Sequence, residues 1–108
     1  MSHEHEFRKT LSARRVELAE RVRRIDTQLN HREEPPPADF ADQASEQENL
    51  EVLRALESEG RSELALVEAA LARLDTNEYG RCQHCGAGIA PARLSALPWT
   101  DCCIACAR

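Results

Sequence analysis

Apolar residues recur at helical spacing along the first third of the chain. No proline or glycine lies between Glu4 and His31, and the apolar residues that recur at helical spacing in this stretch are Leu11, Leu18, Val22, Ile25 and Leu29. Arg15 supplies the position that completes a 4-3-4-3-4 series. This pattern is typical of a heptad seam with one polar interruption, and it predicts a helix over residues 4–31.

A second apolar stripe follows between Asp42 and Leu74. Its members are Leu50, Leu53, Leu64, Val67, Leu71 and Leu74. The middle of the stripe is weak, because Glu57 and Gly60 fall on the same line. A glycine inside a helix costs about 1 kcal/mol relative to alanine. We interpret Gly60 as a soft spot in one continuous helix over residues 42–74.

The segment between the two stripes cannot be helical, because Pro35-Pro36-Pro37 removes backbone donors and disfavours helical geometry in the preceding residues. Asp39, followed three residues later by Asp42, resembles an N-cap with an acidic first turn. Neither narrow stripe can be buried alone. The sequence therefore predicts an all-α fold, an antiparallel helical hairpin (coiled coil) over residues 1–75 with its tip near 33–45. The alternative, a dimer of long helices, is disfavoured by the proline connection, and we expect a monomer.

Cysteine spacing gives the strongest chemical signal. Two C-x-x-C pairs, separated by seventeen residues, consist of Cys82, Cys85, Cys103 and Cys106. This spacing is typical of a four-thiolate zinc site, and four protein ligands leave no open position for a substrate. We therefore expect a small four-cysteine zinc-finger base over residues 76–108, with structural Zn²⁺ as its cofactor. Disulfides are the alternative, but the chain shows no secretion signal that would support them.

Other residues of this segment have expected roles. Three residues separate Cys102 from Cys106, rather than the two of a C-x-x-C pair, so we leave Cys102 as a spare thiol. We expect His84, which lies inside the first pair, to point outwards. Gly86 lets the first cysteine turn close sharply, and Gly80 is expected to end the long helix in a left-handed conformation. The side chains expected to pack around the metal are Ile89, Leu94, Leu97 and Trp99.

The charge of the chain is unevenly distributed. The 108 residues carry a net charge of -5. Residues 1–33 hold eight basic and six acidic groups, residues 34–75 hold three and eleven, and residues 76–108 hold three and two. The acidic middle is either an outward-facing functional segment or a solvated helix face. An acidic protein makes a poor nucleic-acid binder, although Arg81, Arg93 and Arg108 leave that alternative open. Without a transmembrane run or a signal peptide, we expect a cytoplasmic protein.

The whole pattern resembles the DksA/TraR family of bacterial transcription regulators. The stretch Asp39-Phe40-Ala41-Asp42-Gln43-Ala44-Ser45 resembles the tip motif of that family, D-x-x-D-x-A-S/T. The stretch from Tyr79 to Gly86 resembles its first zinc knuckle, and Cys103-Ile104-Ala105-Cys106 resembles its second. The resemblance covers nearly the whole chain.

The resemblance implies a regulator that binds RNA polymerase, not DNA. In that family the hairpin enters the secondary channel of the polymerase, and the tip alters the lifetime of promoter complexes, notably at stable-RNA promoters. The corresponding tip residues here are Asp39, Asp42 and Ala44. The structural alternative for both aspartates is capping of the second helix, and for Ala44 it is plain helix propensity.

The resemblance also identifies a departure from the family. Long members act with guanosine tetraphosphate (ppGpp) in the stringent response, through three basic residues. The same positions here hold Leu66, Leu97 and Ala107, so we expect weak dependence or none, unless Arg93 or Arg108 substitutes. A redox or zinc-sensing role for Cys102 remains an alternative function. No nucleophile–base pair or phosphate loop predicts an enzyme.

Overall fold

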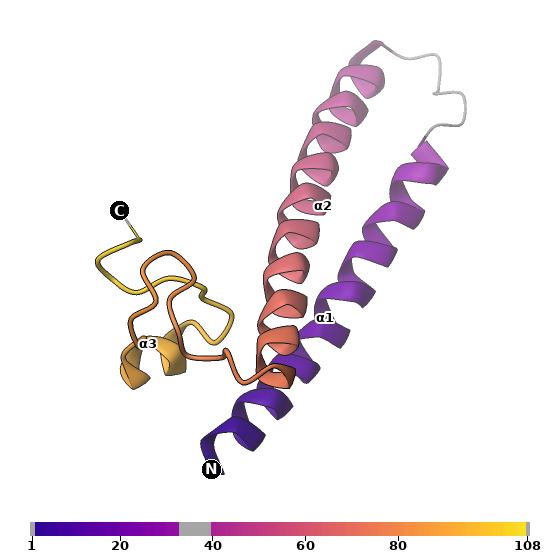
Figure 1. The fold of residues 1–108 in the computed structure, drawn as a ribbon. Coiled ribbons are helices and arrows are strands. Elements are labelled where there is room, and N and C mark those ends of the chain that lie inside the picture. The colour runs from indigo at the N-terminus through magenta and orange to yellow at the C-terminus, as the bar shows by residue number, and fades with distance from the viewer. Residues whose placement is uncertain (1, 33–39, 108) are drawn as a thin grey trace. The chain divides into compact units, whose positions relative to one another are not determined.

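A computed structural model describes residues 2–32 and 40–107, with the side chains of residues 4–30 and 47–107. It contains three α-helices, α1 (Ser2–Arg32), α2 (Phe40–Asp75) and the short α3 (Pro91–Ala96) (Figure 1). The expected fold class is confirmed, with two long helices followed by a small finger. No helix in the described part of the chain combines the length and apolar character that a membrane span needs.

The chain forms two compact units, and each contains a piece of both long helices. Unit 1 is Met1–Val16 with Leu64–Arg108, and unit 2 is residues 17–63. Within unit 1, Arg8 pairs with Asp75 at 2.9 Å, and within unit 2, Asp26 pairs with Arg61 at 2.6 Å. Asp26 comes later along α1 than Arg8, but its partner Arg61 comes earlier along α2 than Asp75. The two helices therefore run antiparallel. The division of the chain after residue 75 stays a prediction.

Burial along α1 confirms the predicted seam with one correction. Leu11, Leu18, Val22 and Ile25 are buried, and Leu29 is half-buried. Arg15, which we expected to fill the gap in the series, is exposed, whereas Arg14 is half-buried. Residues three and four places after Leu11 both lie near its face of a 3.6-residue helix, so spacing alone could not distinguish the two arginines.

Gly60 has a packing role that sequence reasoning missed. The helix is continuous through it, as expected, but Gly60 is buried, and a Cβ atom there would lie 3.0 Å from Val22 Cγ2. The missing side chain therefore lets α1 and α2 approach closely within unit 2. Propensity scales register only the cost of glycine to its own helix, so they predicted a soft spot.

Helix α2 ends at Asp75, and the left-handed residue that caps it is Asn77 rather than Gly80. The Glu78 N–H donates to the Arg73 carbonyl at 2.8 Å, and Asn77 between them has a φ of 61°. This is the hydrogen bond of a Schellman cap with Asn77 in the left-handed position. Gly80 also has a positive φ, 83°, but it shapes the entry to the finger, where its carbonyl accepts from the Ile89 N–H at 2.7 Å.

The finger has a small core within unit 1. Cys82, Ile89 and Leu94 are buried, and Phe7 and Tyr79 pack against them. Leu97, expected to join this core, is 37% exposed, and Trp99 is half-buried. Helix α3, which carries Leu94, was not predicted. Its signal in the sequence is Pro91 at the first helical turn, a position that proline favours.

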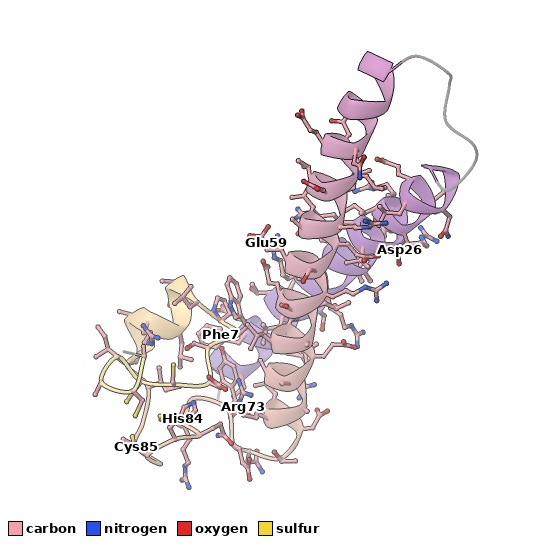
Figure 2. All side chains as sticks on the ribbon, turned by 90° about the horizontal axis from the view of Figure 1, so that it is seen from above. Phe7, Asp26, Glu59, Arg73, His84 and Cys85 are labelled. Carbon is pink, nitrogen blue, oxygen red and sulfur yellow. The ribbon has the colours of Figure 1, made fainter. Side chains whose placement is uncertain are left out.

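Tyr79 joins this core to two other parts of unit 1. Its ring centroid lies 5.3 Å from that of Phe7 on α1, which Figure 2 shows beside the finger. Its hydroxyl donates to the Pro98 carbonyl at 2.9 Å. Burial raises the pKa of Tyr79 to about 12, although the nearby Arg73 guanidinium lowers it in part. The neutral phenol is therefore the form that the folded unit stabilises.

Tyr79 is the only tyrosine, so its titration can be followed directly by tyrosinate absorbance. We expect the folded protein to titrate near a pKa of 12 and the denatured chain near the usual value of about 10. The denatured state then loses its proton first as the pH rises. The tyrosine's contribution to stability is thus complete below about pH 10 and is lost as the pH rises through about 12. Equal titration curves for folded and denatured protein, with circular dichroism confirming the fold, would contradict this assignment.

Candidate metal centre

The first pair of ligands lies on a tight backbone turn. The Cys82 N–H donates to the Ala87 carbonyl at 2.7 Å, and the Gly86 N–H donates to the Cys82 carbonyl at 2.9 Å. Gly86 closes this turn with a φ of 80°, which a residue with a Cβ rarely adopts. The predicted role of Gly86 in the first knuckle is therefore confirmed. The turn directs the sulfurs of Cys82 and Cys85 to the same side.

The second pair lies on its own turn, and the segment before it is held by hydrogen bonds from two helices. The Cys106 N–H donates to the Cys103 carbonyl at 3.1 Å within the turn. Arg93 on α3 donates its Nε–H to the Cys102 carbonyl at 2.9 Å, and Arg73 on α2 donates to the Thr100 carbonyl at 3.3 Å. Two arginines thus fix the segment that leads into the second knuckle.

Arg93 differs from the sequence prediction. The sequence makes this side chain a candidate contact for phosphate or nucleic acid, but the guanidinium is half-buried and already bonded to the finger backbone. Spacing along the chain carries no signal for such a bond, because the partner carbonyl lies nine residues away. Of the other two arginines in that hypothesis, Arg81 is exposed and Arg108 lies outside the described residues.

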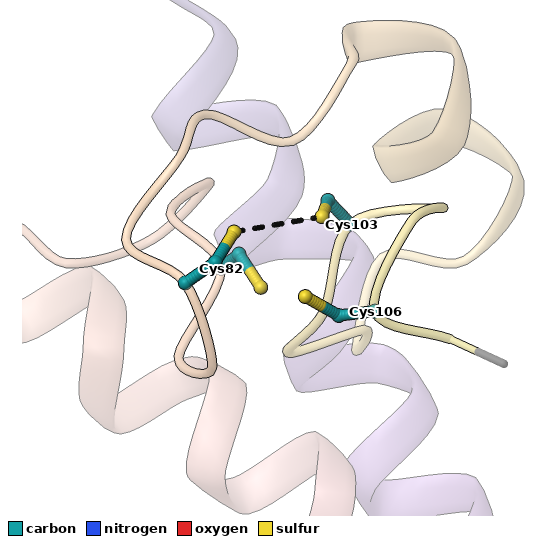
Figure 3. A group of neighbouring side chains, drawn as sticks. Cys82, Cys103 and Cys106 are labelled. Carbon is teal, nitrogen blue, oxygen red and sulfur yellow. Dashed lines mark hydrogen bonds between the residues drawn. The ribbon is translucent and has the colours of Figure 1, made fainter.

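The two knuckles bring all four predicted ligands together. The sulfur atoms of Cys82, Cys85, Cys103 and Cys106 lie within 4.8 Å of one another. Figure 3 shows Cys82, Cys103 and Cys106 in this cluster. Cys85 Sγ and Cys103 Sγ are 3.7 Å apart. Four sulfurs at zinc–sulfur distances of about 2.3 Å form a tetrahedron with edges of about 3.8 Å. The observed spacing therefore fits a tetrahedral thiolate site.

Charge within the cluster is unevenly distributed. Burial raises the pKa of Cys82, but the backbone hydrogen bonds from Cys103, Cys85 and His84 together outweigh burial and lower the pKa to about 6. Side-chain hydrogen bonds with Cys103, Cys82 and Cys85 raise the pKa of Cys106 to about 12. The Cys82 thiol therefore loses its proton readily, whereas the Cys106 thiol keeps its proton. A divalent cation offsets this accumulated negative charge, which is the chemistry expected of a metal site.

Cys102 and His84 lie outside the ligand set, as expected. Cys102 is half-buried, and its Sγ is 3.7 Å from an Arg93 nitrogen and 3.8 Å from Thr100 Oγ1. His84 is exposed, and its Nε2 lies 3.9 Å from an Asp101 carboxylate oxygen.

The remaining predicted residues fall in different places. Asp39 lies outside the described residues, whereas Asp42 and Ala44 belong to the first turns of α2, and their side chains are not described. Leu66 and Leu97 are 42% and 37% exposed, and Ala107 is also exposed. The three positions that the resemblance associates with ppGpp are thus exposed without any basic group.

Comparisons with known families match both parts of the chain. Residues 7–74 match the family described as DnaK suppressor protein-like, N-terminal domain. Residues 77–108 match the prokaryotic dksA/traR C4-type zinc finger. Together with the geometry of the four sulfurs, this match identifies the cluster as a C4-type zinc finger.

Individual relatives agree with these matches. A protein of Haemophilus influenzae named RNA polymerase-binding transcription factor DksA is 33% identical over 93% of this chain and 68% of its own length. The protein of the same name from Escherichia coli K12 is 30% identical, over 93% and 66%. The chain thus spans about two thirds of the length of these relatives. The solved structure of transcription factor DksA2 from Pseudomonas aeruginosa is 31% identical, with a TM-score of 0.83 over 97% of this chain and 80% of that one.

Adjacent cysteines provide a matched test of the ligand set. We expect Cys103→Ser to lose most of its bound zinc and Cys102→Ser to keep it, because only Cys103 belongs to the sulfur cluster. Structural zinc supplies on the order of 10 kcal/mol to small fingers at neutral pH, so the first variant should also unfold the finger. Zinc content by elemental analysis and the fluorescence of Trp99, the only tryptophan, measure the two effects. Zinc loss from the Cys102 variant alone would show that the ligand is wrongly assigned.

Proposed function

This chain belongs to the DksA/TraR family, and from that membership we propose that it is a transcription regulator that binds RNA polymerase through the secondary channel. The observation that carries the proposal is the joint match of helical segment and finger to relatives named as RNA polymerase-binding factors. In this role it changes the stability of promoter complexes, with stable-RNA promoters as the first targets.

The acidic end of the hairpin is the functional part in this proposal. Residues 34–75, which run from the tip through all of α2, carry eleven acidic and three basic groups, and this charge suits a channel with basic walls or bound Mg²⁺. Asp39, Asp42 and Ala44 are the proposed polymerase-modulating residues. Asp42 lies two residues after the start of α2, and the positive N-terminal end of a helix favours a negative charge at such a position. Small Ala44 permits close approach to a partner backbone.

The finger has a supporting role rather than a catalytic one. Its four cysteines fill a tetrahedral metal site, so no ligand position is left for substrate or activated water. Arg93, a residue that a nucleic-acid-binding finger would use, is bonded to the finger backbone. These contacts favour a protein partner over nucleic acid.

The tip can be tested with one charge-neutralising substitution. We expect Asp42→Asn to bind the cognate polymerase but to lose its effect on promoter-complex lifetime by roughly tenfold, because a charged contact is worth about 1.5–3 kcal/mol. Transcription from a stable-RNA promoter, with decay of the open complex, provides the measurement.

Glu51→Gln is the matched control for this experiment. It removes one negative charge from an exposed position on the same helix, outside the tip motif. Equal losses in both variants would point to general electrostatic attraction rather than to the tip. Full activity of Asp42→Asn would contradict the assigned role of Asp42.

The alarmone response can be tested at the three exposed positions. We expect ppGpp to leave the activity of the native protein unchanged, because Leu66, Leu97 and Ala107 cannot pair with phosphate. Replacing all three with lysine should create a ppGpp-dependent increase in the same transcription assay. Strong ppGpp dependence of the native protein would show that other basic residues form the site.

A further inference from the structure

The apolar seam of the hairpin does not by itself fix how α1 and α2 align. Positions 53, 60, 67 and 74 of α2 form one series with a spacing of seven residues. A shift of α2 by seven residues moves three of these four positions onto another member of the series, so the same stripe would still face α1. Such a shift moves the start of α2 along α1 by roughly 10 Å. The chain therefore needs residues that distinguish one alignment from the next.

Gly60 distinguishes the observed alignment by its size. A Cβ atom at this position would lie 3.0 Å from Val22 Cγ2, so even a methyl group would require Val22 to shift. The residues that would replace Gly60 after a shift of seven are Leu53 and Val67. Both would place several carbon atoms where glycine has none. Close packing therefore disfavours both shifted alignments.

Arg61 adds a second criterion, charge. Its Nη2 lies 2.6 Å from Asp26 Oδ2 across the hairpin and 3.6 Å from Glu57 Oε2 on its own helix. Figure 2 shows Asp26 on α1. A shift of seven would bring either Arg54 or Glu68 to the position of Arg61. Arg54 would keep the attraction, whereas Glu68 would set two carboxylates against each other. The ion pair thus disfavours the shift that brings Glu68 opposite Asp26.

The ion pair contributes little to stability. The Arg61 side chain is 57% exposed and that of Asp26 is 33% exposed, and exposed pairs are worth about 0.2–1 kcal/mol. Polar contacts at helix–helix seams are better known for selecting one alignment among several. Gly60 likewise weakens its own helix. Both residues therefore make sense as determinants of alignment rather than of stability.

We propose that Gly60 and Arg61 are positioning residues that fix the alignment of α2 against α1, and so the depth at which Asp42 is presented to the polymerase. The functional half of this statement rests on the proposed function, whereas the structural half does not. Gly60 acts through its contact with Val22, and Arg61 acts through its ion pair with Asp26.

The experiment uses the full zinc-loaded chain and four variants. Gly60→Leu fills the close contact, and Ser62→Leu adds the same side chain at an exposed position of α2 as its control. Arg61→Glu sets like charges against Asp26, and Asp26→Arg combined with Arg61→Glu restores the pair with reversed sign. Circular dichroism establishes that each variant is helical.

Nuclear Overhauser effects measure the alignment directly. We expect a signal between the Val22 methyl groups and the Gly60 α-protons in the native protein, a weakened one in Arg61→Glu, and its return in the charge-reversed pair. In Gly60→Leu the Val22 methyl groups should contact residue 53 or 67 instead. Unchanged signals in Arg61→Glu, together with native Val22 neighbours in Gly60→Leu, would overturn the proposal.

Function is measured on the same proteins. We expect the two disruptive variants to bind polymerase like the native chain and to lose the effect on promoter complexes, with recovery in the charge-reversed pair and no loss in Ser62→Leu. Loss that the reversed pair does not recover would overturn the role of Arg61. A native protein without any effect on promoter complexes would refute the proposed function, while the nuclear Overhauser data would still decide the alignment.

Discussion

The convergence of four sulfur atoms is the interaction on which unit 1 depends. The apolar cluster of the finger has three buried members, Cys82, Ile89 and Leu94, and one of these is itself a ligand. So small a core supplies little hydrophobic stabilisation. Metal binding and folding are therefore one process here, and the contacts of Phe7 and Tyr79 connect that process to the helices of unit 1.

In unit 2, the residues that stabilise the helix pair differ from those that we propose fix its alignment. Leu18, Val22 and Ile25 on α1 are buried and supply the apolar contact. Toward the start of α2, Leu50 and Leu53 are only half-buried. A seam this thin is sufficient to hold two helices together but leaves their alignment to specific contacts. The proposed presentation of Asp42 at a defined depth would depend on that alignment more than on extra stability.

Local signals in the sequence predicted most of the fold. Heptad spacing identified both long helices, and the two C-x-x-C pairs identified all four ligands, because each pattern lies within a short stretch of chain. The errors share a different origin. The choice of Arg14 over Arg15 for the seam, the bond of Arg93 to Cys102 and the exposure of Leu97 all depend on residues distant in sequence. The Asn77 cap is the exception, since a local rule that prefers glycine pointed to Gly80.

Gly60 shows why such errors gather at informative positions. A propensity scale assigns each residue a cost within its own helix, so glycine counts as a defect. Alignment, however, is a property of pairs of residues on two helices, and a repeated leucine carries no information about which repeat it belongs to. Only a residue that differs from the other members of its series can mark one alignment. The position that looks weakest in a single helix is therefore the one that can specify the pairing of two.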